Sequence, residues 1–374
     1  MTAQFSRTST RATMKRVLMA CLMLGMGEVV HALPASPPPA DAEIRQILAN
    51  RIDVEHQSVG IVVGIIDPHR RRIVAYGHLQ QGDGRPLTGD SVFEIGSITK
   101  VFTSLLLTDM VERGKVRLDE PVAELLPVGV RIWIPQRNGQ QITLADLATN
   151  TSGLPRMPDN FRPANLADPY ADYSEKQLYE FLGSYELPRD PGVEWVYSNL
   201  GFGLLGLALA QRAGTSYGTL VQERICRPLG MQSTATVTTP SMAQRLAIGH
   251  SRDLRTVPSW TFTEAMAGAG ALRSTANDLL TFLAAAMGRT RSALTPPFEA
   301  LLSVQRPTGA RFIEAALGWA VDTSGDREII WKGGGTGGYA SFVGYNPINA
   351  SAVVVLSNSD NSVSDLGMQL LDSR

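Results

Sequence analysis

The sequence predicts an α/β protein of the α+β kind, in which an antiparallel sheet built from N- and C-terminal segments is flanked by helices and carries an inserted, mainly helical lobe. Two observations predict this class. Runs of β-branched residues occur near both ends of the 374-residue chain, and the stretch between them has helical spacing. A hydrophobic content of 44% and a charged content of 18% are ordinary for a globular protein with a large core.

The first 32 residues have the features of an export signal. Basic side chains precede the apolar run 17–26, and a small-residue cleavage site ends at Ala32. We therefore expect residues 1–32 to be a signal peptide, residues 33–374 to form the folded domain of the mature protein, and the mature chain to reach the periplasm or be secreted. Elsewhere the sequence has no run of the roughly 20 apolar residues that span a bilayer, so we expect no stable membrane insertion.

Strand signals lie near both ends. Residues 59–66 are rich in β-branched side chains, Asp67-Pro68 marks a turn, and 73–76 resumes the apolar run, which together predict a hairpin. Near the C-terminus, strands are expected at 328–331, 340–345 and 352–356, and a helix at 363–371. We place the sheet lobe at about 41–90 and 305–374.

Helical signals fill the interval between these segments. An apolar face recurs over 98–111 with Gly114 placed to end the helix, and Thr143 to Asp146 resembles a capping box. A second apolar helix is expected from Leu200 to Gly214, and a third after Ser274-Thr275. The helical lobe therefore covers about 97–300, interrupted by a long polar loop over 155–169 that is placed to border a site.

Ser97 and Lys100 are the candidate nucleophile and base. They open the strongest helical pattern, and the i, i+3 spacing puts them side by side. A serine hydroxyl needs a base, and a lysine in a desolvated pocket loses its proton well below its free pKa. The helix N-terminus adds backbone N–H groups near the carbonyl under attack.

Two further motifs accompany this pair. Tyr197-Ser198-Asn199 precedes an apolar helix and offers a titratable hydroxyl and an amide. An isolated Tyr-x-Asn would be better explained as a tyrosine that packs on its own helix, with Asn199 or Ser198 as the N-cap. Trp331 to Tyr339 combines Lys332 at the end of a strand with a run of glycines that permits close approach of a ligand to the backbone.

In this order and spacing the three motifs resemble the Ser-x-x-Lys, Tyr-x-Asn and Lys-Thr-Gly boxes of class C β-lactamases and related DD-peptidases. The resemblance runs from about Val59 to Ser359 and includes the stretch from Ile142 to Pro155 and Arg227-Pro228-Leu229-Gly230-Met231. It implies a β-lactamase/transpeptidase-like fold and a serine hydrolase that works through an acyl-enzyme.

The resemblance also implies roles. Ser97 would attack the carbonyl, Lys100 and Tyr197 would share general-base duty, and Tyr197 would protonate the departing amine and activate the deacylating water. The substrate-binding residues would be Asn199, Lys332, Gly334 and Gly335. Among these, the N–H of Gly335 would join that of Ser97 in an oxyanion hole, and Lys332 would favour the ionised form of Tyr197.

The sequence departs from the family pattern at two places. Gly333 stands where the family has threonine, which removes a hydroxyl that helps to bind the substrate carboxylate. Sequence alone therefore predicts that Gly333→Thr raises peptide cleavage more than β-lactam hydrolysis. The loop position that usually carries glutamine is Arg156 or Met157, so contacts to the acylamino side chain are expected to differ.

These features favour β-lactam hydrolysis, with D-alanyl-D-alanine carboxypeptidase or endopeptidase action as the alternative. An esterase of the same fold and a β-lactam receptor that never turns over are further readings. We expect no cofactor, no metal and a monomer. A net charge of -1 disfavours nucleic acid binding, and Cys226, in an apolar pattern, is expected to be a buried structural thiol. Ser359-Asp360-Asn361 matches a class A box but follows Lys332, so it is interpreted as a polar turn.

Overall fold

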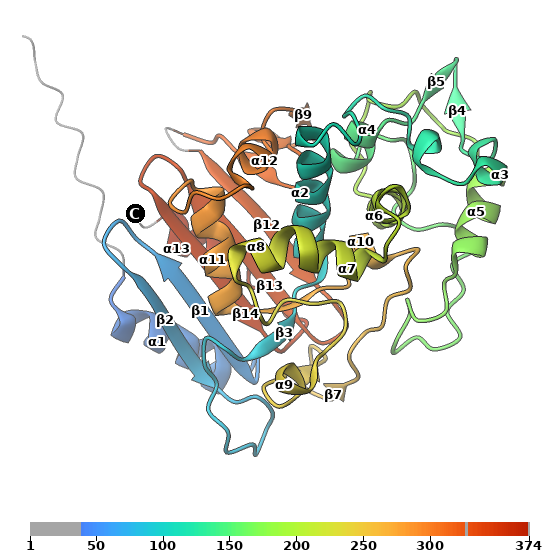
Figure 1. Ribbon diagram of the computed structural model, residues 1–374. Helices are drawn as coiled ribbons and strands as arrows, with labels where there is room; N and C mark the ends of the chain where they lie inside the picture. The colour runs from blue at the N-terminus through green and yellow to red at the C-terminus, as the bar shows by residue number, and fades with distance from the viewer. Residues whose placement is uncertain (1–38, 326–327, 373–374) are drawn as a thin grey trace, which may run out of the picture. The chain divides into compact units, whose positions relative to one another are not determined.

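The computed structural model describes residues 39–325 and 328–372, so the expected signal peptide at 1–32 lies outside the described residues. An eight-stranded sheet, antiparallel at every pairing, draws its strands from both ends of the chain (Figure 1). In spatial order the strands are β2 (Arg71–Gly77), β1 (Gly60–Ile66), β14 (Ser351–Ser357), β13 (Ala340–Asn346), β12 (Ile329–Gly335), β11 (Ala320–Asp322), β10 (Ile313–Ala315) and β9 (Arg306–Pro307).

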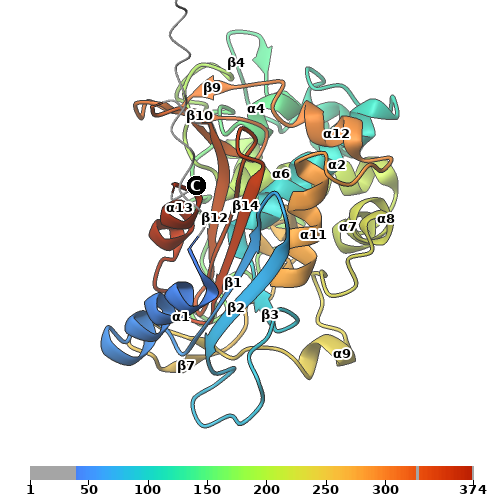
Figure 2. The same ribbon diagram turned by 90° about the vertical axis from the view of Figure 1, so that its left-hand side faces the viewer.

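The central strands are buried on both faces, which explains their continuous apolar runs. In β1, Ile61, Val63 and Ile65 face one side, where they pack with helices α1 (Asp41–Ala49) and α13 (Ser364–Asp372). Val62 and Ile66 face the other side, where α11 (Ala276–Ala286) lies against β1 and β14. Figure 2 shows these two helix layers on opposite sides of the sheet. The predicted hairpin is confirmed, with Ile61 opposite Tyr76.

The interval between the sheet segments is mainly helical, as the sequence predicts. Its longest helices are α2 (Thr99–Glu112) and α6 (Asn199–Ala213), which pack on each other and on α10 (Ala267–Gly270). The others are α3 (Val128–Arg131), α4 (Leu144–Ala148), α5 (Glu175–Ser184), α7 (Tyr217–Val221), α8 (Arg227–Leu229), α9 (Pro240–Ala243) and α12 (Thr295–Ala300).

Short elements complete the fold. Two-stranded sheets are formed by β3 (Val92–Glu94) with β8 (Arg273–Thr275), β4 (Gln136–Arg137) with β5 (Gln140–Gln141), and β6 (Gly249–His250) with β7 (Thr256–Val257). The segments η2 (Gly96–Ile98) and η3 (Val122–Leu125) are 3₁₀ turns, and η1 (Asn50–Val54) and η4 (Gln222–Cys226) are π turns. The boundaries of the two lobes stay a prediction, although α11 packs against the sheet.

Helix ends follow the signals in the sequence. Gly114 has a φ of 64°, its N–H donates to Val111 O, and Lys115 N–H donates to Met110 O, which is a Schellman arrangement at the end of α2. Gly214 ends α6 in the same left-handed region, and Thr143 and Asp146 form the predicted capping box of α4.

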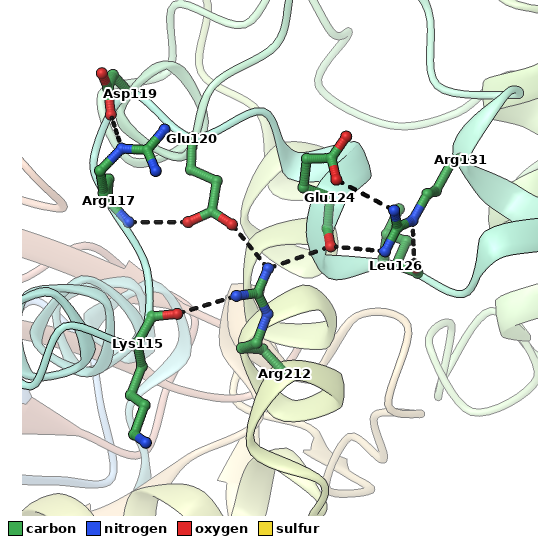
Figure 3. A network of polar contacts seen from close by, with 8 residues as sticks. All are labelled: Lys115, Arg117, Asp119, Glu120, Glu124, Leu126, Arg131 and Arg212. Atoms are coloured by element: carbon green, nitrogen blue, oxygen red, sulfur yellow. Dashed lines mark hydrogen bonds and ion pairs between the residues drawn. The ribbon is translucent and has the colours of Figure 1, made fainter.

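A polar network ties the end of α6 to the segment after α2 (Figure 3). Arg212 donates to Glu120 Oε1 at 2.7 Å and to the carbonyls of Lys115 and Glu124 at 3.0 and 3.2 Å. Glu120 also accepts from the backbone N–H of Arg117 at 3.0 Å. One guanidinium therefore joins three points of the 115–124 segment to α6, the helix that begins at Asn199.

Candidate active site

Ser97 lies where β3 passes into α2. The φ of Gly96 is 47°, and a Cβ there would come within 2.6 Å of the backbone N of Gly335. Only glycine tolerates both that backbone conformation and that close approach. As a result α2 begins at Thr99, and Ser97 occupies the preceding 3₁₀ turn instead of the first helical turn. The amide of Gly335 is thereby held beside the Gly96–Ser97 segment.

Lys100 is fully buried beneath Ser97. Its Nζ donates to Ser97 Oγ at 3.0 Å, to Asn199 Oδ1 at 2.9 Å and to Ala269 O at 2.7 Å. Burial, with a smaller contribution from Arg156, holds the pKa of Lys100 well below its ordinary value. A neutral Lys100 would keep two N–H bonds for Asn199 and Ala269 and turn its lone pair toward Ser97.

Tyr197 approaches Ser97 from the start of α6. Its hydroxyl donates to Ser97 Oγ at 2.6 Å. Three cations lie over its ring, with the Lys100 Nζ 4.9 Å, the Lys332 Nζ 5.1 Å and the Arg156 Cζ 5.1 Å from the ring centroid. Burial lowers the pKa of Lys332. Positive charge of this density stabilises negative charge that develops at the hydroxyl of Tyr197.

The loop between α4 and α5 is fixed to the first turn of α6. The carbonyl of Arg156 accepts from the N–H groups of Asn199 and Leu200 at 3.0 and 3.3 Å, and Ser198 Oγ donates to Pro155 O at 2.7 Å. These contacts satisfy backbone donors that a helix N-terminus leaves free. The loop is therefore positioned by the same helix that begins at Asn199.

The structure distinguishes the two loop residues that the sequence leaves open. Met157 is the one near Asn199, whose Nδ2 lies 3.7 Å from Met157 Sδ and 3.3 Å from the hydroxyl of Tyr170. Arg156 points instead over the ring of Tyr197. The two side chains therefore face different parts of the site.

Two adjoining cavities meet at these residues. The larger, about 520 Å³, is lined by Tyr197, Lys332, Arg156 and Gly333 and walled by Trp195, Trp319 and Ile313. The second, about 450 Å³, is lined by Ser97, Trp260, Ser364 and the run 333–337. Arg156 and Gly333 border both. The reacting hydroxyls therefore face a cleft that is open to a ligand of moderate size.

A buried ion pair connects two segments that lead to residues lining the second cavity. Arg273 NH2 lies 3.2 Å from Glu94 Oε1, which also accepts from the backbone N–H of Trp260 at 2.8 Å. Burial raises the pKa of Glu94. Because Glu94 is three residues before Ser97, this pair links the strand that leads to Ser97 with the segment that carries Trp260.

The residues singled out in the sequence therefore lie together. Ser97, Lys100, Tyr197 and Asn199 form one hydrogen-bonded cluster, and the strand with Lys332, Gly334 and Gly335 borders it. Cys226 is buried, as expected, and burial raises the pKa of its thiol. Ser359-Asp360-Asn361 follows β14, where Ser359 forms an isolated bridge with His250, Asp360 and Asn361 lie in bends, and Asp360 lines the second cavity. The sequence gives no signal for Ala269, whose carbonyl holds Lys100, or for Ser364 at the start of α13.

Within residues 39–325 and 328–372, no cluster of His, Cys, Asp and Glu side chains is arranged to hold a metal ion. In the same part of the chain, every helix is too short or too polar to cross a bilayer.

Comparison with known proteins gives consistent matches over almost the whole chain. The family model described as beta-lactamase matches residues 40–371. The D-alanyl-D-alanine-carboxypeptidase/endopeptidase AmpH of Escherichia coli K12 is 31% identical over 366 residues, which is 92% of each chain. A class C beta lactamase from Rhodobacter sphaeroides superposes with a TM-score of 0.74 at 25% identity, covering 88% of this chain and 97% of the other. The beta-lactamase/D-alanine carboxypeptidase from Yersinia pestis, solved with citrate, gives 0.75 at 27% identity over 89% and 97%.

Proposed function

This chain belongs to the beta-lactamase family, and we propose that it opens the amide bond of β-lactams through an acyl-enzyme on Ser97. The observation that carries the proposal is the pair of contacts at Ser97 Oγ, 3.0 Å from Lys100 Nζ and 2.6 Å from the Tyr197 hydroxyl. A nucleophile with two proton-transfer groups within hydrogen-bond distance, open to a cavity, is suited to acyl transfer.

Acylation begins with removal of the Ser97 proton. Neutral Lys100 takes that proton while Ser97 Oγ forms a bond to the substrate carbonyl carbon, and the N–H groups of Ser97 and Gly335 stabilise the resulting oxyanion. The proton then passes by way of Tyr197 to the departing nitrogen, and the C–N bond breaks. The cations around Tyr197 support this transfer because they lower the cost of a transient phenolate.

Deacylation uses the same groups in reverse. Once Tyr197 has passed its own proton to neutral Lys100, its phenolate removes a proton from water and the water oxygen attacks the acyl carbon. The bond to Ser97 Oγ then breaks, and Ser97 takes a proton from protonated Lys100, which restores all three groups. Asn199 Oδ1 accepts from Lys100, and its Nδ2 faces Tyr170 and Met157, so a substrate acylamino oxygen that accepts from Nδ2 would replace one of those contacts. This chemistry needs no metal or organic cofactor, since nucleophile, base and oxyanion donors all come from the chain.

D-alanyl-D-alanine carboxypeptidase or endopeptidase action is the second candidate. The relative at 31% identity is named for that activity, and it matches this chain more closely than the Escherichia coli beta-lactamase, which is 24% identical. The same acylation steps apply to a D-alanyl peptide. The difference lies in the driving force, because the strained β-lactam ring contributes to acylation and a peptide does not.

We also propose that the chain is exported to the periplasm as a monomer after cleavage near Ala32. The basic and apolar segments before that residue support export, and both candidate substrates are met outside the cytoplasm.

The deciding experiment compares kcat/KM of the purified mature protein on a chromogenic cephalosporin and on diacetyl-Lys-D-Ala-D-Ala. Efficient cephalosporin turnover supports the β-lactamase proposal. Efficient peptide turnover with a long-lived cephalosporin adduct supports the second candidate instead. In either case Ser97→Ala should abolish labelling by a fluorescent penicillin while the circular dichroism spectrum stays unchanged, and labelling that survives would refute the role of Ser97.

A further inference from the structure

We propose that Tyr170, with Met157, limits which acyl groups this site favours, by occupying the Asn199 amide donors that an amide in the substrate would need. A substrate with an acylamino side chain then gains little over one without it. This inference rests on the function proposed above and adds a residue that determines specificity. Tyr170 follows the polar loop over 155–169, and no motif in the sequence marks it.

Both polar ends of the Asn199 amide already have partners. Oδ1 accepts from Lys100 Nζ at 2.9 Å, and Nδ2 lies 3.3 Å from the Tyr170 hydroxyl and 3.7 Å from Met157 Sδ. A primary amide has two N–H donors, and these two contacts use both of them. A thioether sulfur has no hydrogen to donate, so Nδ2 and not Oδ1 must face Met157.

The two partners of Nδ2 also contact each other. The Tyr170 hydroxyl donates to Met157 Sδ at 3.7 Å, which leaves the phenolic oxygen to accept from Nδ2. Burial raises the pKa of Tyr170, so the hydroxyl keeps this proton at neutral pH. The three groups therefore form a closed triangle. A substrate oxygen that reaches Nδ2 must break two of its three contacts, whichever partner moves aside.

Tyr170 is held in place by the rings around it. It is 9% exposed, and its ring stacks on Phe262 with centroids 4.6 Å apart and an interplanar angle of 16°. The rings of Phe161 and Trp260 each lie 5.3 Å from it. Trp260 also lines the cavity that contains Ser97. The hydroxyl of Tyr170 cannot leave Asn199 without loss of these ring contacts.

The triangle lies on the acyl side of the bond that breaks. Lys100 Nζ contacts both Ser97 Oγ at 3.0 Å and Asn199 Oδ1, so Asn199 is two hydrogen bonds from the nucleophile. The departing nitrogen is expected at Tyr197, which contacts Ser97 Oγ directly. An amide near the acyl carbon must give up its hydration for a donor that is already used, and the exchange brings little net gain. An alkyl chain needs no donor there.

The test compares acylation of Ser97 by benzylpenicillin and by its analogue in which the side-chain amide C(O)–NH is replaced by CH₂–CH₂. Both probes keep the β-lactam ring, the carboxylate and the phenyl group. The readout is the ratio of the two acylation rates, amide over dimethylene, measured by intact mass. The intrinsic reactivity of each probe is the same for every variant, so it cancels when ratios are compared between variants.

Two variants open the triangle, and one matched variant leaves it intact. Tyr170→Phe keeps the ring and removes the hydroxyl, and Met157→Leu removes the sulfur at similar volume. Tyr173→Phe is the control, because Tyr173 also packs on Phe161 but its hydroxyl contacts Asn160, at 3.0 Å. Melting temperatures verify that each variant folds.

We expect Tyr170→Phe to raise the amide-to-dimethylene ratio about threefold to tenfold, the factor that one neutral hydrogen bond contributes. Met157→Leu should raise it about twofold, since sulfur is a weak acceptor, and Tyr173→Phe should leave it unchanged. A ratio that stays the same or falls in both Tyr170→Phe and Met157→Leu would overturn the proposal, while adducts on Ser97 would keep the proposed function intact. Absence of any Ser97 adduct in the parent, with either probe, would overturn both.

Discussion

Replacement of Gly333 by threonine restores the side chain that the family pattern has at this position, and the structure changes the expected result. Gly333 does not have a positive φ, so a threonine backbone is unstrained there, and β-branched residues suit a strand. The new Cβ would meet Ser364 Oγ at 3.0 Å, closer than ordinary contact. Since Ser364 Oγ has no hydrogen-bond partner in the described residues, it can rotate away at a cost of about 1 kcal/mol.

The added hydroxyl contributes roughly 1.5 kcal/mol to carboxylate binding, but the new side chain must displace Ser364 Oγ at the cost given above. The two effects nearly cancel. We therefore expect Gly333→Thr alone to change kcat/KM on a carboxylate substrate less than about threefold, whereas in a Ser364→Ala background it should raise kcat/KM about tenfold. Both the cephalosporin and the D-alanyl peptide are measured, and melting temperatures verify that all variants fold.

A gain of tenfold or more from Gly333→Thr in the otherwise unchanged chain would refute this reasoning. It would mean that the contact with Ser364 Oγ costs little free energy, and the expectation from sequence alone, a gain that is larger for the peptide, would stand.

Three further perturbations test the site and its support. Tyr197→Phe should leave acylation detectable and slow deacylation, because the hydroxyl is proposed to activate water; an adduct that clears as fast as in the parent would point to another group. The acylation rate should fall as pH drops through the lowered pKa of Lys100, since only the neutral amine accepts a proton. Arg156→Met should shift this acidic limb of the pH–rate profile to higher pH, because it removes a cation that lowers the pKa of Lys100. An acidic limb that stays at the same pH would contradict the electrostatic link between Arg156 and Lys100. Arg212→Met should lower the free energy of unfolding by about 1–2 kcal/mol, since it removes the partner of buried Glu120, with Arg117→Met, whose pair with Asp119 is exposed, as the neutral control.

Local patterns in the sequence were sufficient to predict much of this structure. The i, i+3 spacing placed Lys100 beside Ser97, and the β-branched runs marked β1, β13 and β14 within one or two residues. The resemblance to the family is confirmed by the match over 40–371. The domain boundaries and the roles of the site residues stay predictions.

Other features depend on contacts between distant segments, which no local pattern encodes. The carbonyl of Ala269 holds Lys100, and Ser364 lies beside Gly333 only because α13 packs on the sheet. The choice between Arg156 and Met157 was open for the same reason, since both are loop residues and only the contact with α6 decides which way each points.

The pairing of β1 with β14 also constrains how the molecule is made. Ile61 lies opposite Ser357, roughly 300 residues later in the chain, so these two strands can pair only after residues up to Ser357 have been synthesised. The strand that carries Lys332 is part of that late segment. Such distant pairings fold slowly, because loop closure must precede the contacts that reward it. A nascent chain would thus contain Ser97 and Lys100, at the start of α2, long before the strand that carries Lys332 exists, so the proposed hydrolytic activity would appear late in folding.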